Sequence, residues 1–237
     1  MNMNVFRMPE WYPKLYKDCF PTVFVELDAP ELEALSQGRT EGDAVKSFLP
    51  ELQRMMSRFS GARFVSVDTA APTDTERFQL KRGAVHSAAS AWKILADSRK
   101  VRAAAEAGEV SGICIRPFRR MQPAREFRLF VRNGKLVGMS QYWLLRHFRR
   151  LPARVERYWD NASALIERIA GDLPVQDLAV DIYFKKTSEI LIVDLNPWGV
   201  PTDPLLYNTW DRDWNVPGKC EIVPPPRTVS GDVNVHF

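Results

Sequence analysis

Hydrophobic and polar positions follow two different spacings along the chain, which predicts a mixture of strands and helices. Short apolar runs, typical of strands, cover residues 23–27, 64–67 and 113–118. Apolar residues spaced three or four positions apart predict helices over residues 43–59 and 87–107. Asp43 and Ser47 are alternative caps for the first of these helices, and Pro50 is expected only in its first turn. A polar stretch at residues 68–75 predicts a loop.

A β-hairpin in the middle of the chain is the clearest local prediction. Strands over residues 127–131 and 136–141 flank Asn133-Gly134, a dipeptide that favours a two-residue type I′ turn. Side chains on the first strand then alternate between two faces, Phe127, Leu129 and Val131 against Arg128, Phe130 and Arg132. One face of this hairpin is therefore expected to be buried, while the other carries arginines.

A second amphipathic helix and a second hairpin follow. The helix is predicted over residues 153–170, with five apolar side chains facing inward: Val155, Trp159, Ala162, Ile166 and Ile169. The hairpin strands are predicted over residues 178–185 and 190–195, joined by a two-residue turn at Thr187-Ser188. Since facing residues are counted outward from the turn, this register places Asp181 directly opposite Asp194.

Asp181 and Asp194 are the candidate metal ligands. Facing Cβ atoms lie about 4.5–5.5 Å apart, a separation at which two carboxylates repel unless a cation lies between them. Asn196, two residues beyond Asp194, adds an amide oxygen on the same face if the strand continues that far. This all-oxygen set suits Mg²⁺ or Mn²⁺. The alternative is two separately solvated aspartates, and a one-residue slip of the turn would also break the pairing.

Composition and motif content exclude several classes of protein. The 237 residues correspond to one or two domains, and 45% hydrophobic with 26% charged residues is typical of a globular protein. The longest aliphatic run, residues 190–193, is too short to span a bilayer, and no secretory signal is expected, so we predict a cytoplasmic protein without membrane contact. Three cysteines and three histidines are too scattered for a zinc site. No glycine-rich Rossmann or P-loop motif occurs.

Charge is distributed unevenly along the chain. Residues 116–157 contain eleven Arg and one Lys against two Glu, a net +10, so the overall +4 leaves the remainder at −6. A solvated helix face is one explanation of such a run. Arginines on strands, among them Arg116 and Arg128, instead form a row that binds anions such as the phosphates of a nucleotide or nucleic acid. Beside the two aspartates, they predict a Mg²⁺-nucleotide site that has no P-loop.

Several short motifs occur in a fixed order: Trp11-Tyr12-Pro13, Ala71-Pro72 with Asp74, Glu126-Phe127-Arg128, Asp181-Ile182-Tyr183, and Asp194-Leu195-Asn196-Pro197-Trp198-Gly199 followed by Thr202-Asp203. In these motifs the chain resembles the cell division cycle protein 123 family, whose fold is of the ATP-grasp type. The resemblance implies an α+β, ATP-grasp-like fold with two β-rich lobes, helices and a nucleotide cleft between the lobes. We accordingly expect an N-terminal lobe with nucleotide-facing strands, residues 1–118, and a C-terminal lobe with the acidic hairpin, residues 119–237.

The resemblance also implies ligands and roles for particular residues. Asp181, Asp194 and Asn196 are expected to bind Mg²⁺, while Arg128 and Arg116 reach the phosphates of ATP. Family members commonly carry lysines at the positions of Ser66 and Pro117 in this chain. No catalytic residue is predicted.

The function implied by the resemblance is that of an ATP-dependent assembly factor or chaperone for a protein partner, because family members in eukaryotes assist translation initiation factor 2. The alternative is an ATP-dependent ligase, acting in RNA repair or joining a carboxylate to an amine, so enzymatic activity stays open. The expected ligands are therefore ATP, Mg²⁺ and an unidentified protein or RNA. A nucleotide-free scaffold is a third possibility.

Overall fold

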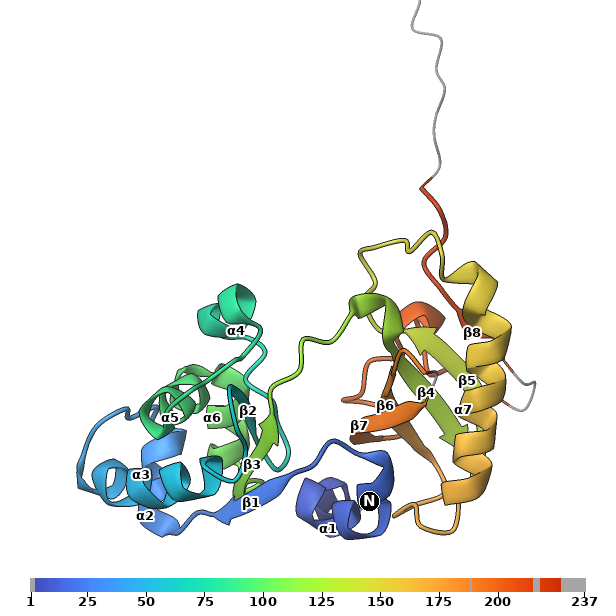
Figure 1. Ribbon diagram of the computed structural model, residues 1–237. Helices are drawn as coiled ribbons and strands as arrows, with labels where there is room; N and C mark the ends of the chain where they lie inside the picture. Colours follow the sequence, from blue (N-terminus) through green and yellow to red (C-terminus); the bar gives the residue numbers. More distant parts are fainter. Residues whose placement is uncertain (1–2, 188, 215–217, 227–237) are drawn as a thin grey trace, which may run out of the picture.

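The computed structural model describes residues 3–187, 189–214 and 218–226, and these are arranged around two β-sheets (Figure 1). The first sheet has the strand order β1-β3-β2 and consists of β1 (Val23–Glu26), β2 (Arg63–Val67) and β3 (Gly112–Pro117). The second has the order β7-β6-β4-β5-β8 and consists of β4 (Glu126–Arg132), β5 (Lys135–Gln141), β6 (Leu178–Phe184), β7 (Ile190–Pro197) and β8 (Cys220–Glu221). Neighbouring strands are antiparallel except β5 and β8, which are parallel. The predicted strands and hairpins are confirmed.

Helices pack against the first sheet and form its hydrophobic core. They are α2 (Ala29–Ser36), α3 (Asp43–Met56), α5 (Ala88–Asp97) and α6 (Arg99–Glu106). Leu35, Leu52 and Trp92 from three of these helices are almost completely buried in one cluster with strand residues such as Ile113. The short helix α4 (Glu76–Lys81) lies at the upper edge of this lobe in Figure 1.

The prediction of a single helix over residues 87–107 is wrong, because two helices occupy this stretch. Ser98 has an extended backbone, with φ −80° and ψ 123°, and separates α5 from α6. Its hydroxyl oxygen accepts a hydrogen bond from the backbone N–H of Val101 at 3.2 Å, which caps α6. Serine forms such caps readily because its short side chain reaches the free N–H groups of a first helical turn.

Helix α3 begins at Asp43, and Gly42 is its N-cap, so neither predicted cap residue occupies the cap position. Pro50 lies inside the helix rather than in its first turn. The helix continues through the proline because a single apolar stripe on both sides of it is buried, Val45 and Phe48 before it and Leu52 and Met56 after it. Tertiary packing of such a stripe supplies most of the stability of a helix in a protein.

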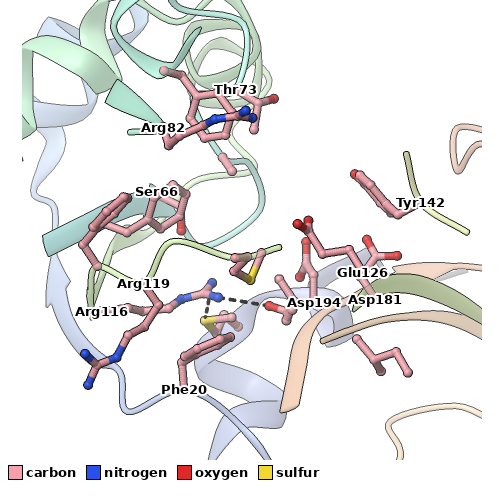
Figure 2. A pocket seen from close by; sticks show the side chains of 18 of the residues that line it. Phe20, Ser66, Thr73, Arg82, Arg116, Arg119, Glu126, Tyr142, Asp181 and Asp194 are labelled. Atoms are coloured by element: carbon pink, nitrogen blue, oxygen red, sulfur yellow. Dashed lines mark hydrogen bonds between the residues drawn. The ribbon is translucent and has the colours of Figure 1, made fainter. Parts of the chain in front are cut away.

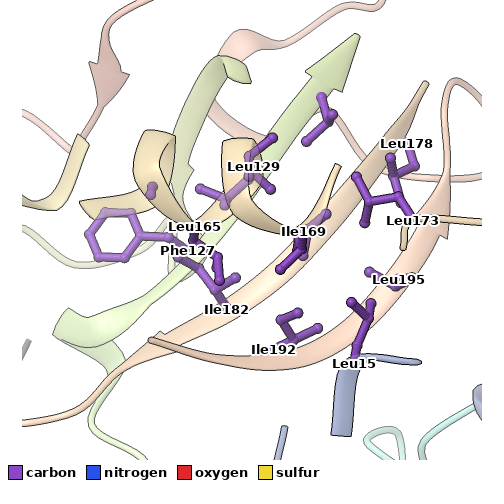
Figure 3. Close-up of a cluster of buried hydrophobic side chains, with 14 of the residues drawn as sticks. Leu15, Phe127, Leu129, Leu165, Ile169, Leu173, Leu178, Ile182, Ile192 and Leu195 are labelled. Atoms are coloured by element: carbon purple, nitrogen blue, oxygen red, sulfur yellow. The ribbon is translucent and has the colours of Figure 1, made fainter. Parts of the chain in front are cut away.

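The second sheet is covered on one face by α7 (Val155–Ile169), as Figure 3 shows. The predicted alternation of β4 is confirmed: Phe127, Leu129 and Val131 lie in the core beneath α7, whereas Phe130 packs on the opposite face with Tyr207 and Trp214. Helix α7 buries Tyr158, Ala162, Leu165, Ile166 and Ile169. Val155 and Trp159, which we predicted to face inward, are only half-buried.

The first helix, α1 (Met8–Leu15), contributes to the core of the second sheet although it precedes the first sheet in the sequence. Trp11 and Leu15 are each 1% exposed there, and Leu15 lies beside Ile192 and Leu195 of β7 (Figure 3). A lobe boundary at residues 118 and 119 stays a prediction. The described residues also form short 3₁₀ helices: η1 (Met3–Phe6), η2 (Tyr16–Asp18), η3 (Pro123–Arg125), η4 (Pro152–Arg154) and η5 (Leu205–Tyr207). In the described part of the chain, no helix has the length and apolar character needed to cross a bilayer.

Candidate functional site

A cavity of about 420 Å³ lies between the two sheets (Figure 2). The first sheet and the loops beside it line it with Phe64, Ser66, Asp68, Thr73, Phe78, Arg82, Arg116 and Pro117. The segment that connects the lobes adds Phe118, Arg119, Arg120 and Met121, and the second sheet with the loop after β5 adds Glu126, Tyr142, Trp143, Asp181 and Asp194. Three of the four lining carboxylates thus lie on the side of the second sheet, whereas the four lining arginines lie on the side of the first sheet and on the connecting segment.

Asp181 on β6 and Asp194 on β7 face each other across the hairpin, as the sequence predicts. The expected turn is nevertheless wrong in register. Phe184 pairs with Ile190, one position out of step with a two-residue turn at Thr187-Ser188, and Ser188 itself lies outside the described residues. A β-bulge restores the pairing, because Ile182 faces Ile192 whereas the next residue on β6, Asp181, faces Asp194.

The bulge has a physical cause in the hydrophobic pattern of β7. Ile192 and Leu195 are both buried in the core, yet residues three apart on a regular strand point to opposite faces. The extra residue, Val193, allows both to point into the core while Asp194 points into the cavity. The broken alternation at 192 and 195 was therefore a sequence signal for the bulge.

Asp181 is held by Arg128 on the neighbouring strand β4. Arg128 donates from Nε to Oδ1 at 2.7 Å and from Nη2 to Oδ2 at 2.8 Å, and its Nη1 donates to the backbone oxygen of Asp203 at 2.8 Å. Arg128 is only 6% exposed and does not line the cavity. Its guanidinium therefore faces a carboxylate in this structure, with all three nitrogens committed.

Asn196 also contacts Asp181, since its Nδ2 donates to Oδ2 at 3.1 Å. The three predicted metal-binding residues are thus brought together at one place. Among the described residues, no cluster of three His, Cys, Asp or Glu side chains suitable for a metal ion is formed. A cation here would therefore need further ligands such as water or phosphate, which is the usual coordination of Mg²⁺.

Unlike Asp181, Asp194 forms no ion pair among the described residues. Burial and the nearby negative charge of Asp181 raise the pKa of Asp194 to about 7, against the opposing influence of Arg116 and of the Leu195 N–H, which donates to Oδ1 at 3.0 Å. The negative charge of Asp181, the second cause of this raised pKa, would also attract a metal cation to the Asp194 carboxylate. The donor set therefore fits a divalent cation.

Arg116, at the end of β3, reaches from the first sheet to the second. Its Nη1 donates to the backbone oxygen of the bulge residue Val193 at 3.1 Å, and its Nη2 lies 3.2 Å from the sulfur of Met8 (Figure 2). Its Nε is buried and has no hydrogen-bond partner among the described residues. A buried guanidinium N–H that lacks an acceptor beside a cavity is a potential donor to an anion.

Residues that the sequence analysis did not select complete the site. Arg82 at the end of α4 and Tyr142 after β5 lie on opposite sides of the cavity (Figure 2). Burial and then Asp181 raise the pKa of Glu126, whereas Trp143 and Arg82 act in the opposite direction. Asp181 is also the main reason why the pKa of Tyr142 is raised to about 12. Arg82 and Glu126 lie 44 positions apart in the sequence, so no local spacing signalled that they meet at one cavity.

Ser66 and Pro117, the positions where the resemblance implies lysines, also line the cavity. The cavity wall therefore has no positive charge at these two places. Arg82, Arg116, Arg119 and Arg120 supply cations around them instead.

Comparison with known proteins identifies a sequence family and a solved structure that this chain is similar to. The model of the family D123 matches residues 86–215, more than half of the chain. The translation initiation factor eIF2 assembly protein of Xenopus tropicalis is 31% identical over 108 residues, which are 44% of this chain and 32% of that protein. The protein of the same name from Kluyveromyces lactis is 37% identical over 101 residues, which are 40% and 25% of the two chains. The matched part is thus about a third or less of each relative's length.

The fold is similar to a solved structure along nearly the whole chain. C-terminally truncated Cdc123 from Schizosaccharomyces pombe superposes with a TM-score of 0.78, over 92% of this chain and 95% of that chain, at 18% identity. At this identity the likeness concerns the fold. The predicted α+β architecture with two β-sheets is confirmed, and it is that of the Cdc123 structure. Its ATP-grasp-like character stays a prediction.

Proposed function

This chain belongs to the D123 family, and from that premise we propose that it binds ATP with Mg²⁺ in the cavity between its sheets and acts as an assembly factor for a protein partner. The observation that carries the proposal is the division of the cavity into an acidic wall with a raised pKa at Asp194 and a side rich in arginines. A metal-bound polyphosphate needs both, because the metal takes carboxylate ligands and the phosphate oxygens take cationic donors.

Asp194, Asp181 and Asn196 would hold the metal ion. A Mg²⁺ ion held there would neutralise part of the negative charge of the phosphates. For Asn196 to act as a ligand its amide oxygen must point to the ion, which requires the amide to rotate from the orientation that donates to Asp181. Arg128 would hold the Asp181 carboxylate in place through its two hydrogen bonds.

Arg116 is the proposed phosphate-binding residue, because its buried Nε lacks an acceptor and its position opposes Asp194. Arg82, Arg119 and Arg120 line the same cavity and would replace the positive charge that Ser66 and Pro117 do not provide. A nucleotide held in this way contacts both lobes and would stabilise one arrangement of them.

The role of assembly factor rests on the relatives, which are named as eIF2 assembly proteins. We propose that this chain assists a protein partner in the same sense, with the nucleotide stabilising the lobe arrangement that binds the partner. A ligase would use the same cavity but would release ADP or AMP once per product, so product analysis separates the two functions.

Thermal unfolding with and without ATP and Mg²⁺ tests the nucleotide site. Ligand at about a hundred times its dissociation constant adds about 2.7 kcal/mol to the free energy of unfolding, a rise of roughly 5–10 °C in Tm for a chain of this length. We expect that rise with Mg²⁺-ATP, a smaller one with ATP and EDTA, and no Mg²⁺-dependent rise in Asp194→Ala. The matched control is Asp160→Asn, on the exposed side of α7. An unchanged Tm at saturating Mg²⁺-ATP in the wild type would refute the proposal.

A further inference from the structure

Three exposed leucines, from both lobes, lie within two residues in the sequence of Arg82 and Trp143, which line the cavity. Leu80, in the last turn of α4, is 74% exposed, and Leu144 and Leu145, in the loop after β5, are 37% and 103% exposed. Helix α4 and this loop lie on the same, upper side of the molecule in Figure 1. We call these three leucines, with the exposed cations around them, the mouth surface. Exposed aliphatic groups gathered beside a ligand cavity are typical of an interaction site.

Contacts between the lobes hold the two parts of the mouth surface together. The guanidinium carbon of Arg82, two residues after Leu80, lies 5.6 Å from the centre of the Trp143 ring, next to Leu144. Both Arg82 and Trp143 line the cavity. This cation–π contact between the lobes thus connects two residues that are close in sequence to the leucines on either side.

The loop that carries Leu144 and Leu145 is fixed by hydrogen bonds. The side-chain amide of Gln141 donates to the backbone oxygens of Trp143 and Arg146, the latter at 2.8 Å, and its Oε1 accepts from the backbone N–H of Val223 at 3.2 Å. The structure thus holds these leucines in solvent at fixed positions. An ordered surface loses less conformational entropy when it binds a partner than a flexible one does.

Positive charge surrounds the leucines. Seven exposed cations lie on α4, on the connecting segment and on the loop: Lys81, Arg82, Arg119, Arg120, Arg146, Arg149 and Arg150. The ion pairs formed among the described residues do not include any of them. The complementary ligand therefore carries negative charge together with apolar groups.

We propose that the mouth surface binds an acidic, leucine-rich segment of a protein partner, which deepens the proposed function and rests on it. The exposed apolar groups favour protein over RNA. Unpaired bases stack on aromatic faces, but Tyr142 and Trp143 each already have an arginine over the ring, Arg128 at 5.5 Å and Arg82 at 5.6 Å. Exposed leucines contribute binding free energy chiefly when they become buried against other apolar side chains.

The position of this surface couples partner and nucleotide. Arg82, Arg119 and Arg120 belong both to the mouth surface and to the cavity wall. A segment bound across α4 and the loop would cover the entrance and slow the release of a nucleotide beneath it. Binding of either ligand would then strengthen binding of the other.

Fluorescence anisotropy at 150 mM salt tests the proposal with three labelled probes. They are a 15-residue peptide of Asp, Glu and Leu, the same peptide with every Leu replaced by Ser, and a decauridylate. We expect the leucine peptide to bind about tenfold more tightly than the serine peptide. Leu144→Ser/Leu145→Ser should abolish this difference, and Arg146→Glu/Arg149→Glu/Arg150→Glu should weaken binding of both peptides at least tenfold.

Matched variants elsewhere on the surface control for general effects. Val200→Ser removes another exposed apolar side chain, and Lys46→Glu/Arg54→Glu/Arg58→Glu reverses three exposed cations on α3 and just after it, so both should bind the peptides like the wild type. The Tm of every variant is measured to confirm that it is folded. Equal binding of the two peptides by the wild type, or a preference for leucine that survives in Leu144→Ser/Leu145→Ser, overturns the proposal. Tighter binding of the decauridylate, insensitive to the leucines, identifies a nucleic-acid surface instead.

One further variant separates failure of this proposal from failure of the nucleotide site. Asp194→Asn should lose the Mg²⁺-ATP stabilisation and keep peptide binding in the absence of nucleotide. Peptide binding without any nucleotide effect in the wild type would leave the mouth surface supported and refute only the nucleotide site. The reverse result would refute only the mouth surface.

Discussion

Two facing aspartates differ in how their charge is compensated. Asp181 is paired in a bidentate manner with Arg128, whereas the pKa of Asp194 rises to about 7 because of burial and the charge of Asp181. Removing one partner of a buried ion pair leaves an uncompensated charge, which costs far more than loss of a surface pair. The roles of the two residues can therefore be separated by substitution.

Arg128→Met should lower the free energy of unfolding by about 3–5 kcal/mol, because Asp181 is then left buried without a counter-charge. The control is Arg168→Met. Arg168 makes a similar bidentate contact to Asp18, at 2.7 and 2.9 Å, but its side chain is 59% exposed, so the loss should stay below about 1 kcal/mol. Urea unfolding measures both, and equal losses would contradict the assigned role of Arg128.

Asp194 should make stability depend on pH. The folded protein binds this proton more tightly than the unfolded chain, whose Asp titrates near pH 4, so this group lowers the free energy of unfolding as pH rises from about 4 to about 7. Asp194→Asn removes the effect, and its stability relative to the wild type should increase between pH 5 and pH 8. Urea unfolding at several pH values, with Asp160→Asn as control, measures the difference. A constant difference across this range would contradict the raised pKa.

Among elements, the breaks in regular structure matter most for the site. The bulge at Val193 brings Asp194 opposite Asp181 and gives Arg116 a carbonyl acceptor. Ser98 separates α5 from α6 and caps α6. Its hydroxyl also donates to Asp74 at 2.6 Å, so the loop that precedes α4 is bound to the start of α6. That loop contributes Thr73 to the cavity.

Ser98→Ala should lower the free energy of unfolding by about 1–2 kcal/mol, through loss of the helix cap and of the buried bond to Asp74. Ser47→Ala is the matched control. Ser47 is exposed within α3 and its hydroxyl bonds only to the Ala44 carbonyl, at 3.0 Å, so a change within about 0.5 kcal/mol is expected. Chemical denaturation followed by circular dichroism compares the two. Similar losses would show that Ser98 is an ordinary helix-surface serine.

In the whole molecule, the N-terminal segment joins the two lobes. Trp11 and Leu15 are buried in the core of the second sheet, while the backbone N–H of Met8 donates to the Asp68 carbonyl at 3.1 Å, beside the first sheet. Arg7 reaches the Gly108 carbonyl at 3.1 Å. Together with Arg116, these contacts hold the sheets on either side of the cavity.

Trp11→Ala should lower the free energy of unfolding by about 3–5 kcal/mol, the usual loss when a large aromatic side chain is removed from a core. Its indole Nε1 also donates to the Phe6 carbonyl at 3.2 Å. Tyr16→Ala, directly after α1 and 53% exposed, is the control and should change the free energy of unfolding by less than about 1 kcal/mol. Urea unfolding monitors both variants. A small loss for Trp11→Ala would mean that the segment is only loosely attached to this core.

Local sequence determined much of the architecture. The Asn133-Gly134 turn, with φ of 51° and 69°, requires only the conformational freedom of two adjacent residues, and the alternation of β4 follows from the period of a strand. The facing aspartates were also predictable, although the predicted turn was wrong and a bulge compensated for it. Such patterns depend on residues only a few positions apart, so they can be predicted from a single sequence.

Tertiary structure decided what each charged residue faces. Arg128 pairs with Asp181, 53 positions away, and Arg116 reaches Val193, 77 positions away. The packing of α1 on the second sheet likewise joins the beginning of the chain to its last third. Such contacts depend on how whole elements bury their apolar faces, which is a property of the complete core. The sequence alone therefore determined which residues are chemically capable, and the fold determined which of them meet.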